Sequence, residues 1–131
     1  MKDVLGIGGI FFKANDSEKL AAWYQEHLGL KVEDYGGVTF REDDVAVSPA
    51  SKRQAYLVWS PFPADTDYFA PSEKPFMINF RVADLDALLT RLRAEGVTVD
   101  ERTEKSDFGY FGWIMDPEGN RIELWEPPEE K

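Results

Sequence analysis

The sequence has no cysteine and a single histidine among its 131 residues. The lack of cysteine excludes disulfide bonds and thiolate chemistry, and it favours a reducing compartment, so we expect a cytoplasmic protein. No apolar run is long enough to span a bilayer. The N-terminal residues MKDVLGIGG also lack the apolar stretch and cleavage pattern of a signal peptide.

Positive charge is scarce. The chain has 15 Lys and Arg against 25 Asp and Glu, a formal net charge of −10. This balance argues against nucleic acid and anionic membranes as partners and is compatible with a cationic ligand. The alternative is that the acidity serves only solubility. With 43% apolar residues, the chain is long enough for one domain with a core.

Two similar stretches lie about half the chain apart. Residues 12–16 read FKAND and residues 80–84 read FRVAD, and each is followed by a helix-like run and a glycine. The similarity returns at the end of each half, where residues 57–61 read LVWSP and residues 123–127 read ELWEP. The sequence therefore predicts a duplicated structural unit.

Each unit begins with a strand that leads into a helix. Asp16 and Asp84 are the expected N-caps, and the helices are expected to end at Gly29 and Gly96. Short strands are expected after each helix, and DPEG at 116–119 has the composition of a turn. The expected strands after the helices are 30–35, 37–42 and 54–60 in the first half, and 97–102, 110–115 and 120–126 in the second.

One such unit is too small to bury a core, whereas two units side by side can form a curved sheet with the helices outside. We therefore expect an α+β fold in a single domain spanning 1–131, with module one at about 5–61 and module two at about 76–127. The link 62–75 is rich in proline and polar residues. We expect it to reach over a pocket mouth or a neighbouring subunit and to bury Tyr68 and Phe69.

The paired modules and the closing segment DPEGNRIELWEP resemble the vicinal oxygen chelate superfamily over roughly residues 5–127. That superfamily includes glyoxalase I, extradiol dioxygenases, fosfomycin-modifying enzymes and bleomycin-resistance proteins. The resemblance implies two βαβββ modules that form an open, mixed sheet around a pocket. It also implies a homodimer.

The resemblance also implies a divalent metal held by the first and last strands of each module. The corresponding positions here are Gly9, Leu57, Met77 and Glu123. One carboxylate among four is a poor donor set, so we expect no metal and no other cofactor, and the closest similarity in character is to metal-free bleomycin-resistance proteins. His27 lies late in the first helix, where it suits the helix dipole better than a ligand role.

Strand alternation predicts an aromatic pocket with one acid at its floor, which suits flat or cationic organic ligands. The alternative is that the aromatic rings only pack in a core, and for Trp59 and Trp125 pocket and dimer contact remain equally open. The residues expected to bind ligand are Phe11, Leu57, Trp59, Met77, Asn79, Arg81, Trp113, Glu123 and Trp125.

Glu123 is the only candidate for a catalytic residue. Either Arg121, Arg81 or Lys13 satisfies its carboxylate, or the group is buried alone with a raised pKa and acts as a base. The leading hypothesis is a protein that binds a small organic molecule without metal. The alternatives are a glyoxalase- or dioxygenase-type enzyme with an atypical site at Glu123, or a subunit whose pocket is vestigial.

Overall fold

The computed structural model describes residues 3–41 and 56–128. Within these ranges two helices and eight strands follow one another along the chain. The first half contains β1 (Val4–Ala14), α1 (Ser17–Leu28), β2 (Val38–Arg41) and β3 (Tyr56–Pro63). The second half contains β4 (Phe76–Val82), α2 (Leu85–Ala94), β5 (Thr98–Val99), β6 (Glu104–Ser106), β7 (Gly109–Met115) and β8 (Arg121–Glu126).

Both helices begin as the sequence predicts. The Asp16 carboxylate accepts a hydrogen bond from the Lys19 amide, and the Asp84 carboxylate accepts one from the Ala87 amide. Each bond satisfies an amide that has no partner within its helix. At the other end of α1, Gly29 adopts a left-handed conformation with φ of 70°, which glycine reaches without steric cost. These caps confirm both predicted starts and the predicted end of α1, whereas α2 ends at Ala94 with Glu95 as its C-cap, one residue before Gly96.

The strand predicted at 30–35 is absent. These residues form a loop whose polar groups are satisfied locally: the Val32 amide donates to the Gln25 side chain, and the Glu33 amide donates to the Gly37 carbonyl. A segment that closes on itself in this way has fewer backbone groups left for a neighbouring strand. The strand predicted at 97–102 is likewise reduced to Thr98–Val99.

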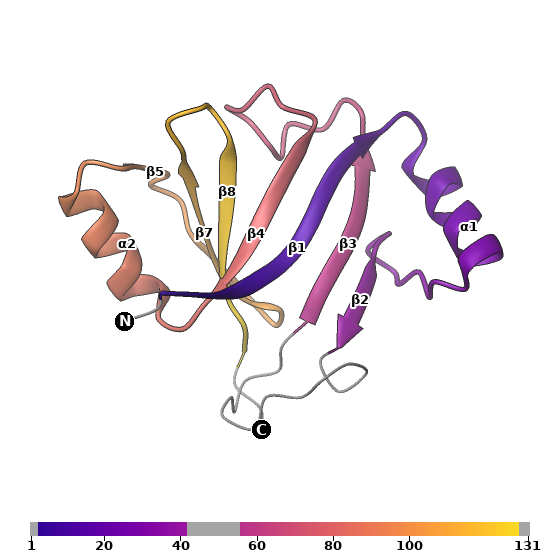
Figure 1. The fold of residues 1–131 in the computed structure, drawn as a ribbon, viewed down its shortest axis with the longest axis horizontal. Helices are drawn as coiled ribbons and strands as arrows, with labels where there is room; N and C mark the ends of the chain where they lie inside the picture. Colours follow the sequence, from indigo (N-terminus) through magenta and orange to yellow (C-terminus); the bar gives the residue numbers. More distant parts are fainter. Residues whose placement is uncertain (1–2, 42–55, 129–131) are drawn as a thin grey trace.

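The strands form one open sheet in the order β2-β3-β1-β4-β8-β7-β5, with β6 paired to β7. In each half the first strand runs parallel to the last, β1 with β3 and β4 with β8. The two halves join through the antiparallel pair of β1 and β4. Figure 1 shows the consequence, with α1 and α2 at opposite ends of the sheet. The mixed open sheet confirms the predicted fold class.

The sheet has an outer face that carries the helices and an inner face that carries the site. On the outer face, Leu85 and Leu89 of α2 pack with Leu124 of β8, and Tyr24 of α1 contacts Trp59 of β3. On the inner face, a second cluster of buried residues joins the link to the sheet; it consists of Phe11, Phe69, Met77 and Trp113. No helix in the described ranges has the length and apolar character needed to cross a membrane.

Candidate functional site

A row of side chains crosses the inner face of the sheet. Val58 pairs with Gly9, Gly9 with Asn79, Asn79 with Glu123, and Glu123 with Trp113. Because residues paired across neighbouring strands point to the same face, the row brings five strands to one place. Of its members, only Asn79 and Glu123 carry side-chain oxygen atoms. The two modules therefore meet at a floor that is polar only on the side of module two.

Three neutral donors surround the Glu123 carboxylate. The Tyr68 hydroxyl donates to Oε2 at 2.6 Å, the Trp113 indole donates to Oε2 at 2.9 Å, and the Asn79 amide donates to Oε1 at 2.6 Å. The Glu123 side chain is 1% exposed. Burial raises the pKa of Glu123, and the three hydrogen bonds oppose that rise because they stabilise the ionised form.

The contact with Glu123 also changes the acidity of the Tyr68 phenol. Burial and the neighbouring Glu123 carboxylate raise the pKa of the Tyr68 phenol. The phenol thus remains a hydroxyl that can donate. Among the described residues, none forms an ion pair with Glu123, and the carboxylate is not buried alone either. Both alternatives that the sequence offered are therefore wrong. The sequence pointed to Arg121, Arg81 or Lys13, whereas neutral groups hold it instead.

The row opens into a cavity of about 820 Å³. Of the sixteen described residues that line it, seven are aromatic and four are acidic, and none is Lys, Arg or His. The lining residues are Phe11, Glu33, Asp34, Tyr35, Thr39, Val58, Ser60, Phe62, Tyr68, Asn79, Asp107, Phe108, Phe111, Glu123, Trp125 and Pro128. Aromatic rings can stack on flat groups and attract cations through their electron-rich faces.

Two consecutive glycines form the floor where β1 crosses the sheet. The register with β4 shifts between Ile7 and Gly9, as at a β-bulge. A Cβ atom on Gly8 would lie 2.1 Å from Asn79 Oδ1, and a Cβ atom on Gly9 would lie 2.9 Å from the Phe11 ring. Both positions thus face the inner side, and any larger residue would displace the side chains of the site. The missing side chains leave room for Asn79, Trp125 and Phe11.

The link 62–75 covers one end of the inner face. Phe69 is completely buried and its ring lies 5.1 Å from that of Phe62, which in turn stacks on Tyr68. Tyr68 lines the cavity. The prediction that the link reaches over a pocket is confirmed. It places one hydrogen-bond donor and two rings over the floor.

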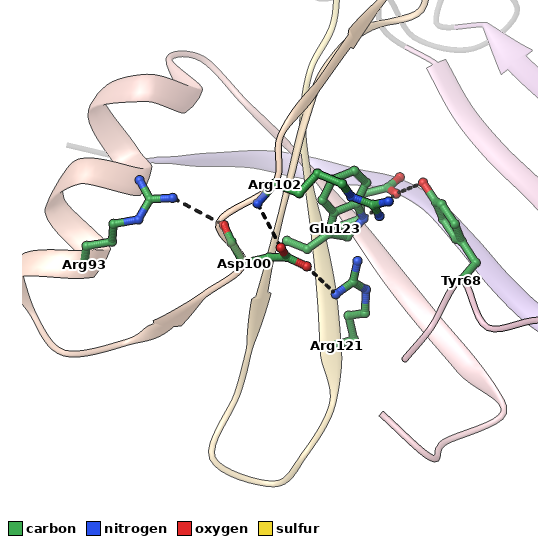
Figure 2. A network of polar contacts seen from close by, with 7 residues as sticks. Tyr68, Arg93, Asp100, Arg102, Arg121 and Glu123 are labelled. Atoms are coloured by element: carbon green, nitrogen blue, oxygen red, sulfur yellow. Dashed lines mark hydrogen bonds and ion pairs between the residues drawn. The ribbon is translucent and has the colours of Figure 1, made fainter. Parts of the chain in front are cut away.

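Behind the cavity, a polar network supports Trp113. The Arg121 guanidinium lies 5.1 Å from the centre of the Trp113 ring and donates to Asp100 at 3.3 Å. The Arg102 guanidinium lies 4.8 Å from the centre of the same ring, and the backbone amide of Arg102 donates to the Asp100 carboxylate. Figure 2 shows Asp100 between Arg93, Arg102 and Arg121. The Arg102 amide is the main cause that lowers the pKa of Asp100, so its carboxylate stays charged beside the buried Arg121.

Most of the predicted ligand-binding residues lie on the inner face. Phe11, Asn79, Glu123 and Trp125 line the cavity. Met77 and Trp113 are fully buried in the inner cluster, so they support the cavity from behind. Arg81 lies beside Gly6 and Gly8 on the same face. The structure therefore brings together seven of the nine predicted residues; these are Phe11, Met77, Asn79, Arg81, Trp113, Glu123 and Trp125.

Leu57 and Trp59 do not reach the inner face. Leu57 is 42% exposed on the outer side, and Trp59 packs against Tyr24 of α1. The expected face was wrong by one residue because Gly9 pairs with Val58, and a shift of one residue turns every side chain of a strand over. Val58 and Ser60 take the places expected for Leu57 and Trp59. The predicted grouping of Gly9, Leu57, Met77 and Glu123 is therefore replaced by the row described above.

Several residues of the site were not predicted. Tyr68 was expected to be covered, but nothing in the sequence signalled its bond to Glu123. Tyr35 and Phe108 line the cavity from loops before β2 and β7. Each follows an aspartate and precedes a glycine, and this shared pattern could have identified them from the sequence. His27 lies outside the cavity, exposed in the last turn of α1 beside Trp23.

The inner face does not fit the divalent metal that the resemblance implies. The row supplies one carboxylate and one amide, while Gly9 and Val58 supply no donor. Within the described ranges no group of three or more His, Cys, Asp or Glu side chains is placed to hold a metal ion. First-row divalent ions need several nitrogen or oxygen donors.

A sequence model of the Glyoxalase/Bleomycin resistance protein/Dioxygenase superfamily matches residues 6–124. The chain belongs to this superfamily. The match spans both modules and ends within β8, one residue after Glu123. A search of curated proteins finds no match to this chain.

Solved structures share the fold at low sequence identity. Methylmalonyl-CoA epimerase from Mycobacterium tuberculosis is 23% identical with a TM-score of 0.58, over 98% of this chain and 91% of that one. A variant of the Streptomyces coelicolor methylmalonyl-CoA epimerase, in complex with 2-nitronate-propionyl-CoA, is 18% identical with a TM-score of 0.62, over 95% and 98%. A superfamily member from Vibrio splendidus 12B01 is 11% identical with a TM-score of 0.52, over 89% and 95%. At these identities the likeness concerns the fold alone.

Proposed function

We propose that this protein binds a small organic molecule with a planar or cationic group in the inner cavity, without a bound metal. The observation that carries the proposal is the Glu123 carboxylate at the floor of an aromatic cavity. Its three hydrogen-bond donors are all neutral. A ligand cation would supply the counter-charge that these donors lack, and this gain offsets the loss of water around the ion.

The charge around the cavity supports the same guest. Glu33, Asp34 and Asp107 line it in addition to Glu123. The aromatic rings favour a cation through their electron-rich faces and a flat molecule through stacking. An anionic molecule such as a coenzyme A thioester would meet four acids and, among the described lining residues, no base. The cavity therefore favours cations over anions.

A thermal-shift screen tests the proposal with cationic, neutral and anionic aromatic compounds of matched size. We expect stabilisation by cations, and Glu123→Gln should reduce it while leaving the fold intact. The new carboxamide can keep all the partners of Glu123, because a turn of the Asn79 amide would let Asn79 accept where it now donates. Stabilisation by anions alone would overturn the proposal.

The metal-free state has its own test. Elemental analysis of protein purified without chelators should show no stoichiometric Ni, Zn, Fe or Mn, because the inner row supplies too few donors. One equivalent of such a metal per chain would contradict the proposal. Glu123→Gln then serves as the control, since loss of the metal in that variant would place it at this site.

A second candidate function is an enzyme of the glyoxalase or dioxygenase type with Glu123 as its base. Burial raises the pKa of this carboxyl, and the Tyr68 hydroxyl lies beside it; a carboxylate with a raised pKa is a stronger base. The two epimerases that share the fold suggest the first assay. Solvent deuterium incorporation into methylmalonyl-CoA, lost in Glu123→Gln, would support an enzyme.

We also propose a homodimer. Leu5, Ile7 and Ile10 of β1 expose apolar side chains on the outer face, where α1 packs against β3 and β1 and α2 packs against β5, β7 and β8. An exposed apolar surface of this kind is typical of a protein contact. Light scattering at micromolar concentration should give a dimer mass, and Ile7→Glu should give a monomer that still binds ligand. A wild-type monomer would contradict the proposal.

A further inference from the structure

A second cavity, of about 650 Å³, lies between α1 and the end of β3. The pairing of β2 with β3 ends at Val38 and Trp59. In the described ranges, no strand therefore pairs with Ser60–Pro63 on that side of β3. Instead, α1 lies beside β3 (Figure 1). The wall of the second cavity, which we call the edge cavity, is formed by α1, the loop before β2 and the end of β3.

The edge cavity adjoins the inner cavity. The residues that line both cavities are Asp34, Tyr35, Ser60 and Phe62. Asp34 and Tyr35 belong to the loop before β2, whereas Ser60 and Phe62 belong to the end of β3. The two cavities therefore meet where this loop lies over the end of β3, and one molecule can extend from one cavity into the other.

The edge cavity differs from the inner cavity in its chemistry. Among the described residues that line it, the only rings are those of Tyr35 and Phe62, which it shares with the inner cavity. The apolar residues that line the edge cavity alone are small and aliphatic: Ala21, Ala22, Val32, Pro61 and Pro63. Such a wall removes hydrocarbon groups from water but offers no further ring for stacking. It therefore suits an aliphatic chain better than a second flat group.

The Ser60 hydroxyl lies where the two cavities meet. Ser60 is 5% exposed, and its Oγ forms no hydrogen bond with any described residue. This oxygen is not one of the atoms that the protein seals off completely, so a molecule in either cavity can reach it. A nearly buried hydroxyl without a partner is unfavourable. A bound molecule should therefore present a polar atom at Ser60.

We propose that the ligand has two parts, a flat cationic head that lies in the inner cavity and an aliphatic chain that extends past Ser60 into the edge cavity. The chain contains an ether or carbonyl oxygen that accepts a hydrogen bond from the Ser60 hydroxyl. It carries no negative charge, because Glu18 and Asp34 line the edge cavity and no described Lys, Arg or His does. This inference rests on the proposed function and describes its ligand further.

Three quinolinium ions test the inference by calorimetry. On their nitrogen they carry a methyl group, a heptyl chain, or a methoxyethoxyethyl chain of the same length as heptyl. All three share one flat head and a charge that does not depend on pH. Burial of one methylene group strengthens binding about fourfold. Burial of only two would thus make the heptyl ion bind about tenfold more tightly than the methyl ion.

Ala22→Trp tests where the chain lies. Ala22 lines the edge cavity but not the inner cavity, so the indole should occupy the place of the chain and leave the place of the head open. The gain in affinity from the heptyl chain should be largely lost. Glu26→Trp is the matched control, because it adds the same ring to α1 at a residue that lines neither cavity. This control should retain the gain.

Ser60→Ala gives a second test that leaves α1 unchanged. The methoxyethoxyethyl chain has oxygen atoms that can accept from the Ser60 hydroxyl, whereas the heptyl chain has none. In the variant, the affinity of the methoxyethoxyethyl ion relative to that of the heptyl ion should fall several-fold, the fold-change for loss of about one net hydrogen bond. An unchanged ratio would overturn the hydrogen bond at Ser60.

The wild-type protein alone separates this inference from the proposed function. If the methyl ion binds and the heptyl ion binds no more tightly, the inference is overturned and the proposed function stands. If none of the three ions binds, both are overturned. An equal gain from the heptyl chain in Ala22→Trp and Glu26→Trp would also overturn the inference, because the chain would then lie outside the edge cavity.

Discussion

The Tyr68 hydroxyl lies 2.6 Å from Oε2 of Glu123, although 55 residues separate the two along the chain. Tyr68 belongs to the link between the modules, and Glu123 belongs to β8. The bond thus fastens the link to the floor of the cavity. Any change at Glu123, by ionisation or by a ligand, acts on the segment that covers the site.

Tyr68→Phe removes one of three donors to a buried carboxylate, and we expect a loss of about 1–2 kcal/mol in the free energy of unfolding. Urea denaturation measures the loss. Tyr110→Phe is the matched control, since the Tyr110 hydroxyl donates to Asp86 at 2.7 Å on the surface and should contribute less than about 0.5 kcal/mol. Equal losses in the two variants would show that the buried bond has no special weight.

We expect Glu123 to make the stability of the fold depend on pH. Its pKa is raised by burial above the ordinary value of 4.5, so the folded chain retains a proton that the unfolded chain has already released. The stabilisation is present below pH 4.5 and is lost as the pH rises through the raised pKa of the folded state. Relative to Glu123→Gln, the wild-type protein should lose stability as pH rises through this window. The opposite trend in urea unfolding would mean that the three donors outweigh burial.

Gly8→Ala should deform the floor. The new Cβ would lie 2.1 Å from Asn79 Oδ1 and 2.9 Å from the Trp125 ring, and overpacking of this kind destabilises by about 1–3 kcal/mol. Gly6→Ala is the control, because its Cβ would meet only the flexible end of Arg81. It should change the free energy of unfolding by about 0.5 kcal/mol. Thermal unfolding compares the two. An unchanged melting temperature in Gly8→Ala would contradict the close approach.

Asp100→Ala tests the support behind Trp113. Arg121 is 4% exposed, and it forms an ion pair with Asp100. Leaving this guanidinium without that carboxylate should destabilise by about 2 kcal/mol. The control is Glu95→Ala, which removes an exposed partner of Arg91 and should matter little. If both variants unfold at the same urea concentration, the network does not stabilise the fold.

Local patterns predicted the parts of the fold that depend on local chemistry. Asp16 and Asp84 cap their helices because the carboxylate of a short side chain reaches a free backbone amide in the first turn. This contact does not depend on the rest of the fold. The alternation in β4 also placed Met77, Asn79 and Arg81 on one face correctly, because a strand of regular register repeats every second residue.

The register between neighbouring strands could not be predicted from the sequence. The similarity of LVWSP and ELWEP aligned Trp59 with Trp125, yet Trp59 packs on α1 and Trp125 lines the cavity. Which face a strand presents depends on its pairing with neighbours distant in the chain, here the pair of Gly9 with Val58. The bulge at Gly8 and the bond from Tyr68 to Glu123 arise from the same kind of long-range contact, so no local pattern signals them.

The order of the strands bears on the synthesis of the protein. β8 is the last strand along the described chain, yet it lies in the interior of the sheet, between β4 and β7 (Figure 1). While a nascent chain still lacks β8, the facing edges of β4 and β7 have no partner, and such edges invite pairing with other chains. The nascent protein is therefore exposed to such pairing until β8 has left the ribosome.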